Sequence, residues 1–171
     1  MADVKPIPEG CEGPIPHLVV EGCSDALGFY ARALGAEERM RMPGPDGQKI
    51  MHAEIQVGGH PIYLCDDFPE MGGPPRSPKA IGGSPVTIHR YVTDCDASLK
   101  RFEEAGGNIM MPATDMFWGD RYGMGVDPYG HVWSFATHKA DLTPEQMGQK
   151  QAEFFASGAC GGGPEGGEAP G

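Results

Sequence analysis

The sequence predicts an α+β domain made of two tandem β-α-β-β-β modules, whose strands form a curved mixed sheet around a cup-shaped pocket. The main observation is a repeat, because residues 17–36 and 89–108 align without gaps. The aligned pairs are His17 with His89, Cys23 with Cys95, Leu27 with Leu99, Tyr30 with Phe102 and, further on, Gly58 with Gly130. A repeat that keeps its period through strand, helix and turn indicates a duplicated structural unit.

Each copy is predicted to begin with a short strand, at 15–20 and at 86–92, followed by one helix. The helices carry apolar residues three or four positions apart and end at glycines, which favour a left-handed C-terminal cap. Three further strands complete each copy, and the last two are joined by a glycine-containing turn. One helix for four strands covers only one face of a sheet, so the other face is left for a ligand.

The domain is predicted to span 15–142, with modules at 15–66 and 84–142 and a Pro- and Gly-rich linker at 67–83. An irregular lead-in at 1–14 precedes it. Thr143 followed by Pro144 is typical of a helix start, so a C-terminal helix is expected at 143–157, burying Met147, Phe154 and Phe155. The glycine-rich tail at 158–171 is expected to be disordered.

Composition excludes several partners. The formal net charge is -11 and the isoelectric point is about 4.8, so the chain repels nucleic acid and anionic membranes. Eighteen apolar residues never run together, so no membrane span is expected. The five cysteines form no CxxC pair and the N-terminus carries no secretion-signal pattern, which indicates a cytoplasmic protein with reduced thiols.

Several short phrases resemble a known superfamily. They are Phe29-Tyr30 followed by ALGA, the turn Asp127-Pro128-Tyr129-Gly130-His131, and the stretches MHAEIQVGG, GGSPVTIHRYV and MFWGDRYG. The chain resembles the vicinal oxygen chelate superfamily of glyoxalases, extradiol dioxygenases and fosfomycin- and bleomycin-resistance proteins. Within it, the chain looks most like a bacterial demethylubiquinone-methyltransferase-like branch. The resemblance implies a small-molecule ligand and a homodimer.

The resemblance also implies where a metal would be held, on the first and last strands of each copy. Those positions fall on Ile15 and Thr87, and on Ile62 and Ser134. Divalent metals need imidazole or carboxylate ligands, which these four residues do not provide. We therefore expect no metal at the usual site and no cofactor.

A displaced site is the alternative. His17 and His89 lie two residues beyond the usual first-strand positions, on the same strand face, and the pseudo-twofold symmetry of the repeat is expected to bring them together. With Glu54 they would form a two-His, one-carboxylate set suited to iron, zinc or manganese. Otherwise the histidines line a polar pocket, and Glu54 acts as a base or pairs with Arg121 or Lys49.

Aromatic residues supply further candidates. Trp118 could stack on a planar ligand, and Arg121 could hold a carboxylate or phosphate, unless Arg121 only pairs with Asp120 to brace a loop. Tyr91 continues the His89 face. Arg90, by contrast, has the parity of the helix-facing side, so it either reaches the edge of the sheet or marks a register error.

The leading interpretation is a small-molecule-binding protein without the usual metal site. Its ligand-binding residues are predicted to be His17, His89, Glu54, Tyr91, Trp118 and Arg121. The alternative is a metal-dependent lyase, isomerase or dioxygenase with the displaced His/His/Glu site, so the sequence leaves open whether the protein is an enzyme.

Overall fold

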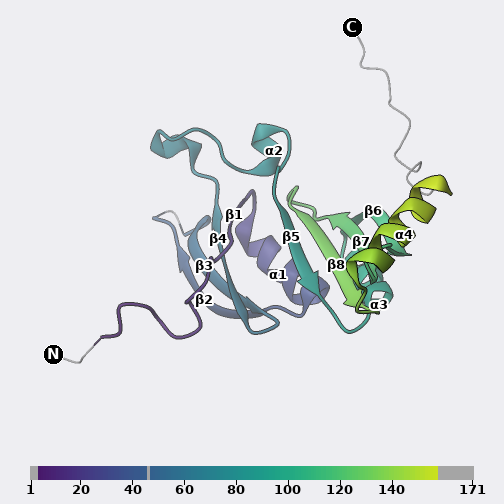
Figure 1. Cartoon of the computed structure of the whole chain (residues 1–171). Coiled ribbons are helices and arrows are strands. Elements are labelled where there is room, and N and C mark those ends of the chain that lie inside the picture. Colours follow the sequence, from purple (N-terminus) through teal and green to yellow (C-terminus); the bar gives the residue numbers. More distant parts are fainter. Residues whose placement is uncertain (1–3, 46, 158–171) are drawn as a thin grey trace, which may run out of the picture.

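The computed structural model describes residues 4–45 and 47–157 (Figure 1). The first copy contains β1 (His17–Val20), α1 (Cys23–Leu34), β2 (Glu37–Pro43), β3 (Ile50–Val57) and β4 (His60–Asp66). The second contains β5 (Thr87–Tyr91), α3 (Cys95–Glu104), β6 (Asn108–Asp115), β7 (Asp120–Val126) and β8 (Val132–His138). Two short helices, η1 (Pro69–Met71) and α2 (Pro78–Ile81), lie between the copies, and α4 (Pro144–Ala156) follows the second.

Each copy forms its own four-stranded mixed sheet. The N-terminal sheet has the strand order β1-β4-β3-β2 and the C-terminal sheet has the order β5-β8-β7-β6. In both, the first strand runs parallel to the last, and the remaining pairs are antiparallel. The tandem β-α-β-β-β prediction and the α+β class are confirmed. The difference is that the strands form two separate sheets, which one chain does not close into a single cup.

The two helices pack against each other in a shared core. Helix α1 covers one face of the N-terminal sheet, helix α3 covers one face of the C-terminal sheet, and Figure 1 shows α1 between the sheets. The rings of Phe29 and Phe102 meet with centroids 5.5 Å apart, and those of Tyr30 and Trp133 with centroids 5.7 Å apart. Because both sheets turn their helix-covered faces toward this core, their other faces turn away from each other.

Two glycines let α3 lie close to β7. A Cβ atom on Gly123 would sit 2.3 Å from Cδ1 of Leu99, and one on Gly125 would sit 2.7 Å from Cε1 of Phe102. Any side chain there would push the helix away from the sheet, since a packed core has no room for added atoms.

A buried carboxylate fastens the two copies together. Asp127 is only 4% exposed. Its Oδ2 accepts hydrogen bonds from the Tyr30 hydroxyl at 2.7 Å and from Trp133 Nε1 at 2.9 Å. Its Oδ1 accepts the backbone N–H groups of Tyr129 and His131. The Asp-Pro-Tyr-Gly-His turn of the second copy is thus structural, because its Asp127 binds helix α1 of the first copy.

Two arginines of the second copy cap α1. Arg90 Nη1 donates to the carbonyl of Leu34 at 2.9 Å, and Arg101 Nε donates to the carbonyl of Ala33 at 3.0 Å. Cations at a helix C-terminus satisfy unpaired carbonyls and oppose the negative end of the helix dipole. Arg90 therefore lies on the helix-facing side of β5, as its place in the strand alternation predicted. Its positive charge is accounted for by the carbonyl end of α1 that it contacts.

Helix α4 differs from the prediction in its packing. Thr143 and Gln146 form a capping box, and Pro144 takes the first helical position. No residue of α4 is buried, however: Met147 is 37% and Phe155 is 55% exposed, and Phe154 and Phe155 contact the ring of Phe117. The expected burial of Met147, Phe154 and Phe155 is wrong, because the helix starts from a local capping signal and not from core packing. The tail at 158–171 and its expected disorder lie outside the described residues.

The bond from Tyr30 to Asp127 can be tested directly. Burial and the neighbouring Asp127 carboxylate raise the pKa of Tyr30 well above its usual value, so the hydroxyl stays a donor. We expect Tyr30→Phe to lower the free energy of unfolding by about 1.5–3 kcal/mol, the usual loss for a hydrogen bond to a buried charge. Urea denaturation measures it. Tyr129→Phe is the control, because its hydroxyl makes no hydrogen bond within the described chain, and an equal loss in both variants would contradict the assignment.

Candidate functional site

The open face of the C-terminal sheet collects polar and aromatic side chains. Strand alternation turns Trp133 and Phe135 of β8 into the core and leaves Ser134 on the opposite face. The registers place His89 beside Ser134 and Asp120 beside His138, with Tyr122 between Asp120 and Met124 along the same face. We use "C-terminal face" for His89, Tyr91, Trp118, Asp120, Tyr122 and Ser134.

Asp120 is the first residue of β7, at one end of this face, and it is only 5% exposed. Its Oδ2 accepts hydrogen bonds from the Tyr91 hydroxyl at 3.0 Å and from Trp118 Nε1 at 3.1 Å. The bond to the Asp120 carboxylate raises the pKa of Tyr91. Asp120 therefore fixes the orientation of two rings. The Tyr91 residue nevertheless remains 61% exposed to solvent.

His138 sits between two carboxylates. Its Nδ1 lies 2.8 Å from Oδ1 of Asp120, and its Nε2 lies 3.0 Å from Oδ1 of Asp141. The hydrogen bond to Asp120, followed by the bond to Asp141, raises the pKa of His138. Through these two contacts the His138 side chain ties the end of β8 to the loop that leads to α4.

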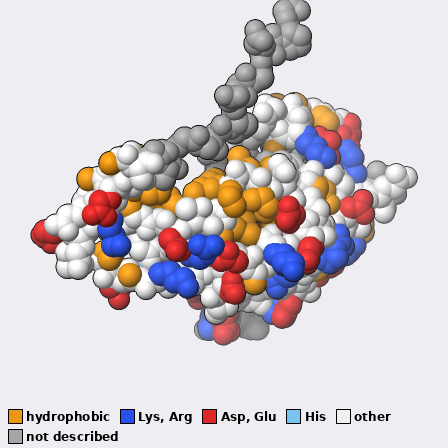
Figure 2. All heavy atoms as spheres, turned by 90° about the vertical axis from the view of Figure 1, so that its right-hand side faces the viewer, with side chains coloured by type: hydrophobic (Ala, Val, Ile, Leu, Met, Phe, Trp, Pro, Cys, Tyr) orange, Lys and Arg blue, Asp and Glu red, His pale blue; other side chains and the backbone are white. Residues whose placement is uncertain are grey.

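Four rings form the exposed surface of the C-terminal face. His89 stacks on Tyr122 with a centroid distance of 6.0 Å and an interplanar angle of 19°, and its Nδ1 lies 2.9 Å from Ser134 Oγ. The Tyr91 ring meets His89 edge-on at 4.9 Å, and the Trp118 ring meets Tyr122 at 5.7 Å. Such an arrangement can stack against a planar molecule and offer it hydroxyl and imidazole groups. Figure 2, which looks at the molecule from the right-hand side of Figure 1, shows apolar side chains gathered between charged ones.

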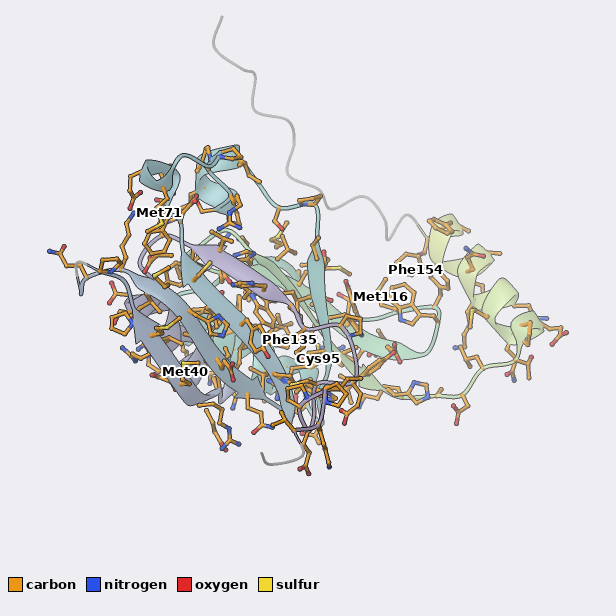
Figure 3. The ribbon with its side chains drawn as sticks, turned by 90° about the vertical axis from the view of Figure 1, so that its left-hand side faces the viewer. Met40, Met71, Cys95, Met116, Phe135 and Phe154 are labelled. Atoms are coloured by element: carbon orange, nitrogen blue, oxygen red, sulfur yellow. The ribbon has the colours of Figure 1, made fainter. Side chains whose placement is uncertain are left out.

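The open face of the N-terminal sheet carries a second, smaller group of histidine, tyrosine and glutamate side chains. Figure 3 shows this sheet toward the viewer, with Met40 labelled on β2. The His17 ring lies 5.9 Å from that of His52 and 6.1 Å from that of Tyr63, and His52 Nε2 lies 3.2 Å from Glu54 Oε1. Burial, with smaller contributions from His52 and Arg76, lowers the pKa of His17. The lowered pKa favours the neutral form of His17, which lies beside the contact of His52 with Glu54.

The six residues predicted to bind the ligand do not form one group within a chain. His17 and Glu54 belong to the N-terminal sheet, whereas His89, Tyr91 and Trp118 belong to the C-terminal face. Arg121 faces α3 and pairs with Asp96 at 2.7 Å and Asp115 at 3.2 Å, and not with Asp120. Across residues 4–45 and 47–157, no three His, Cys, Asp or Glu side chains are arranged to hold a metal ion.

The assignment of the usual last-strand metal position to Ile62 is one residue out of register. His89 pairs with Ser134, whereas His17 pairs with Tyr63, so Tyr63 is the partner of Ser134 in the first copy. Ile62 is 5% exposed and belongs to the core. The cause is the turn length. Two residues, Gly58 and Gly59, separate the paired Val57 and His60 in the first copy, whereas three, 128–130, separate the hydrogen-bonded Asp127 and His131 in the second. A phenol and a hydroxyl with Ile15 and Thr87 still make a poor divalent-metal site.

Sequence reasoning missed Asp120, Tyr122 and His138 as members of the site. Asp120 had been considered only as a partner of Arg121, its neighbour in sequence. The period-two alternation of β7 and β8 was the available signal, because it places Asp120 and Tyr122 on the side opposite Arg121.

The fold and its faces define a class of duplicated α+β proteins with two open sheet surfaces. A family model described as "Glyoxalase/Bleomycin resistance protein/Dioxygenase superfamily" matches residues 15–135. The chain belongs to this superfamily.

Three relatives illustrate the likeness. The uncharacterized protein Rv0887c of Mycobacterium tuberculosis is 48% identical over 133 residues, which cover 77% of this chain and 78% of that protein. The crystal structure of TioX from Micromonospora sp. ML1 superposes with a TM-score of 0.56 at 26% identity, covering 77% of this chain and all of that one. FosX of Listeria monocytogenes, solved as a mutant with Mn(II), shares the fold at 15% identity and a TM-score of 0.56, covering 82% of this chain and 98% of that one. Among the described helices, none has the length and apolar character needed to cross a membrane.

The ion pairs of His138 predict a pH dependence. The pKa of His138 is raised above the unfolded value of about 6.5, so its contribution is full below that pH and is lost as the pH rises through the folded-state pKa. We expect His138→Gln to lower the thermal midpoint at about pH 6 and to change it little at about pH 9. His60→Gln, which removes an exposed imidazole from the start of β4, is the control. An equal loss at both pH values would refute the charge interaction.

Proposed function

We propose that the protein binds a small, partly aromatic organic molecule on the C-terminal face, without a metal ion at the positions usual for its superfamily. The observation that carries this proposal is the set of rings held around Asp120. Tyr91 and Trp118 are oriented by this buried carboxylate, and His89 and Tyr122 extend the surface. Rings fixed in this way lose little conformational entropy on binding, which favours affinity.

A cationic ligand suits this surface best. The faces of Tyr91, Tyr122 and Trp118 attract a positive charge through their π-systems. Asp120 adds a negative charge close beneath them, and the net charge of -11 raises the local concentration of cations around the molecule. The expected ligand is therefore a flat aromatic cation.

Metal chemistry is not part of this proposal because the donor set does not fit. The usual positions hold Ile15, two residues before β1, and Thr87 on β5, with Tyr63 and Ser134 on the last strands. None is an imidazole or a carboxylate, and the hydroxyl of Ser134 is already bonded to His89.

A homodimer would complete the pocket. In one chain the two open faces turn apart, so each is a half-site exposed to solvent. A second copy could place its N-terminal sheet, with exposed Met40 and Met42, opposite the C-terminal face. We also propose that the protein acts in the cytoplasm, where the free thiols of Cys11, Cys23, Cys65 and Cys95 would stay reduced.

The second candidate is a metal-dependent lyase, isomerase or dioxygenase. The observation that favours it is the contact of His52 with Glu54 beside His17, a donor set of the kind metals prefer. His89 would have to come from a partner chain, because it lies on the other sheet.

Ligand binding to the C-terminal face can be measured with proflavine, a flat aromatic cation. We expect Tyr91→Leu and Trp118→Leu each to weaken its binding by about five- to thirtyfold, the loss of one aromatic contact. Isothermal titration calorimetry gives the affinities. Phe155→Leu is the matched control, since Phe155 is 55% exposed on α4 and, among the described rings, contacts Phe117 and Phe154 but neither Tyr91 nor Trp118. Equal affinity in all four proteins would contradict the proposal, as would equal affinity for acridine, a mostly neutral analogue at neutral pH.

The dimer can be tested by sedimentation velocity. We expect the native chain to sediment as a dimer, and Met40→Glu with Met42→Glu to shift it toward the monomer, because charges replace apolar contacts at the proposed interface. Met71→Glu is the control, because this exposed methionine lies on η1, in the segment that connects the two copies, and not on the open face of the N-terminal sheet. A native chain that stays monomeric at all concentrations would refute this part of the proposal.

A further inference from the structure

A cavity of about 280 Å³ lies at the seam between the two copies. Its walls come from the N-terminal segment, from the end of β3 and the start of β4, and from β5 with the start of β8. It is distinct from the C-terminal face, although His89 borders both.

Most of the cavity wall is apolar. Ile15, Ile62, Ile88 and Trp133 line it, together with prolines of the N-terminal segment. A dry apolar cavity of about 150 Å³ is large enough for benzene, so this one has room for a substituted aromatic ring. Ile88 and Trp133 are also part of, or packed against, the shared core, which makes this wall rigid.

One positive charge lies against these apolar walls. Arg90 lines the cavity, and the described residues give it one hydrogen-bond acceptor, the carbonyl of Leu34. No carboxylate of the described chain pairs with it, and the charged group that influences it is another cation, Arg101. Burial and Arg101 together lower the pKa of Arg90. A partly buried cation without an anion is unfavourable, and a bound carboxylate would relieve this.

We propose that this cavity is a second binding site, which takes a small aromatic carboxylate. The ring lies among Ile15, Ile88 and Trp133, and the carboxylate accepts hydrogen bonds from the free N–H groups of Arg90. His60 and His89 also border the cavity and supply further polar contacts. Because the ligand touches both copies and the N-terminal segment, its binding stabilises the way they pack together.

The experiment uses para-nitrobenzoate as the probe and para-nitrobenzamide as its neutral counterpart. The chain has two tryptophans, so Trp118→Phe leaves Trp133 as the single indole, and a nitroaromatic ring beside it quenches its fluorescence. We expect saturable quenching by the acid, and binding of the amide about ten- to a hundredfold weaker, the usual value of a charge-assisted contact. Calorimetry on the unsubstituted chain checks the affinity.

A matched pair of variants separates ligand contact from fold stability. Arg90→Gln and Arg101→Gln each remove one cation that caps α1, but only Arg90 lines the cavity. We expect Arg90→Gln to weaken the acid by about ten- to a hundredfold and Arg101→Gln to leave it unchanged. If Arg90→Gln does not fold, Ile15→Phe, which fills the cavity, must weaken the acid while the thermal midpoint is kept.

Three results would overturn the second site: no saturable quenching, equal binding of acid and amide, or equal losses in Arg90→Gln and Arg101→Gln. The outcome is independent of the C-terminal face. Trp118→Leu is expected to weaken proflavine and leave para-nitrobenzoate unchanged, so failure of one site does not imply failure of the other.

Discussion

The packing of α1 against α3 is the constraint on which the rest of the structure depends. Each helix covers one sheet, and the two helices share a core in which Phe29 meets Phe102 and Tyr30 meets Trp133. A sheet with one helix has one covered and one open face. Once both covered faces turn toward the same core, both open faces must turn outward. The protein thereby keeps two polar, aromatic surfaces available, at the cost that neither is enclosed by the chain that carries it.

Two buried carboxylates act on this framework in different ways. Asp127 has four donors and holds a turn of the second copy against Tyr30 of the first, so it has no capacity left for a ligand. Asp120 is as deeply buried, but the rings that it holds reach the surface. A buried charge must be matched by hydrogen bonds. At Asp127 these bonds join the two copies, and at Asp120 they orient side chains that reach the surface.

The repeat and its period were enough to predict the fold of each copy, because strands, helices and caps are determined by local sequence. They even placed Arg90 on the correct face before its partner, the end of α1, was known. The arrangement of the copies was not predictable in this way, since a repeat defines two similar units and not the contact between them. His17 and His89 are therefore on separate sheets, although the symmetry suggested a shared site. Ile62 was misplaced because two turns of different length shift the register by one residue. Asp120 was missed because two of its partners, Tyr91 and His138, are distant in sequence.

The central proposal is that groups suited to an organic molecule, and not to a metal ion, stand where the superfamily usually has its metal ligands. Elemental analysis of protein purified without chelators, beside a His89→Ala variant, tests this most directly. The account predicts no stoichiometric transition metal in either protein, while the native chain still binds proflavine. Stoichiometric iron, zinc, nickel or manganese that disappears in His89→Ala would contradict it and establish the metal-dependent alternative.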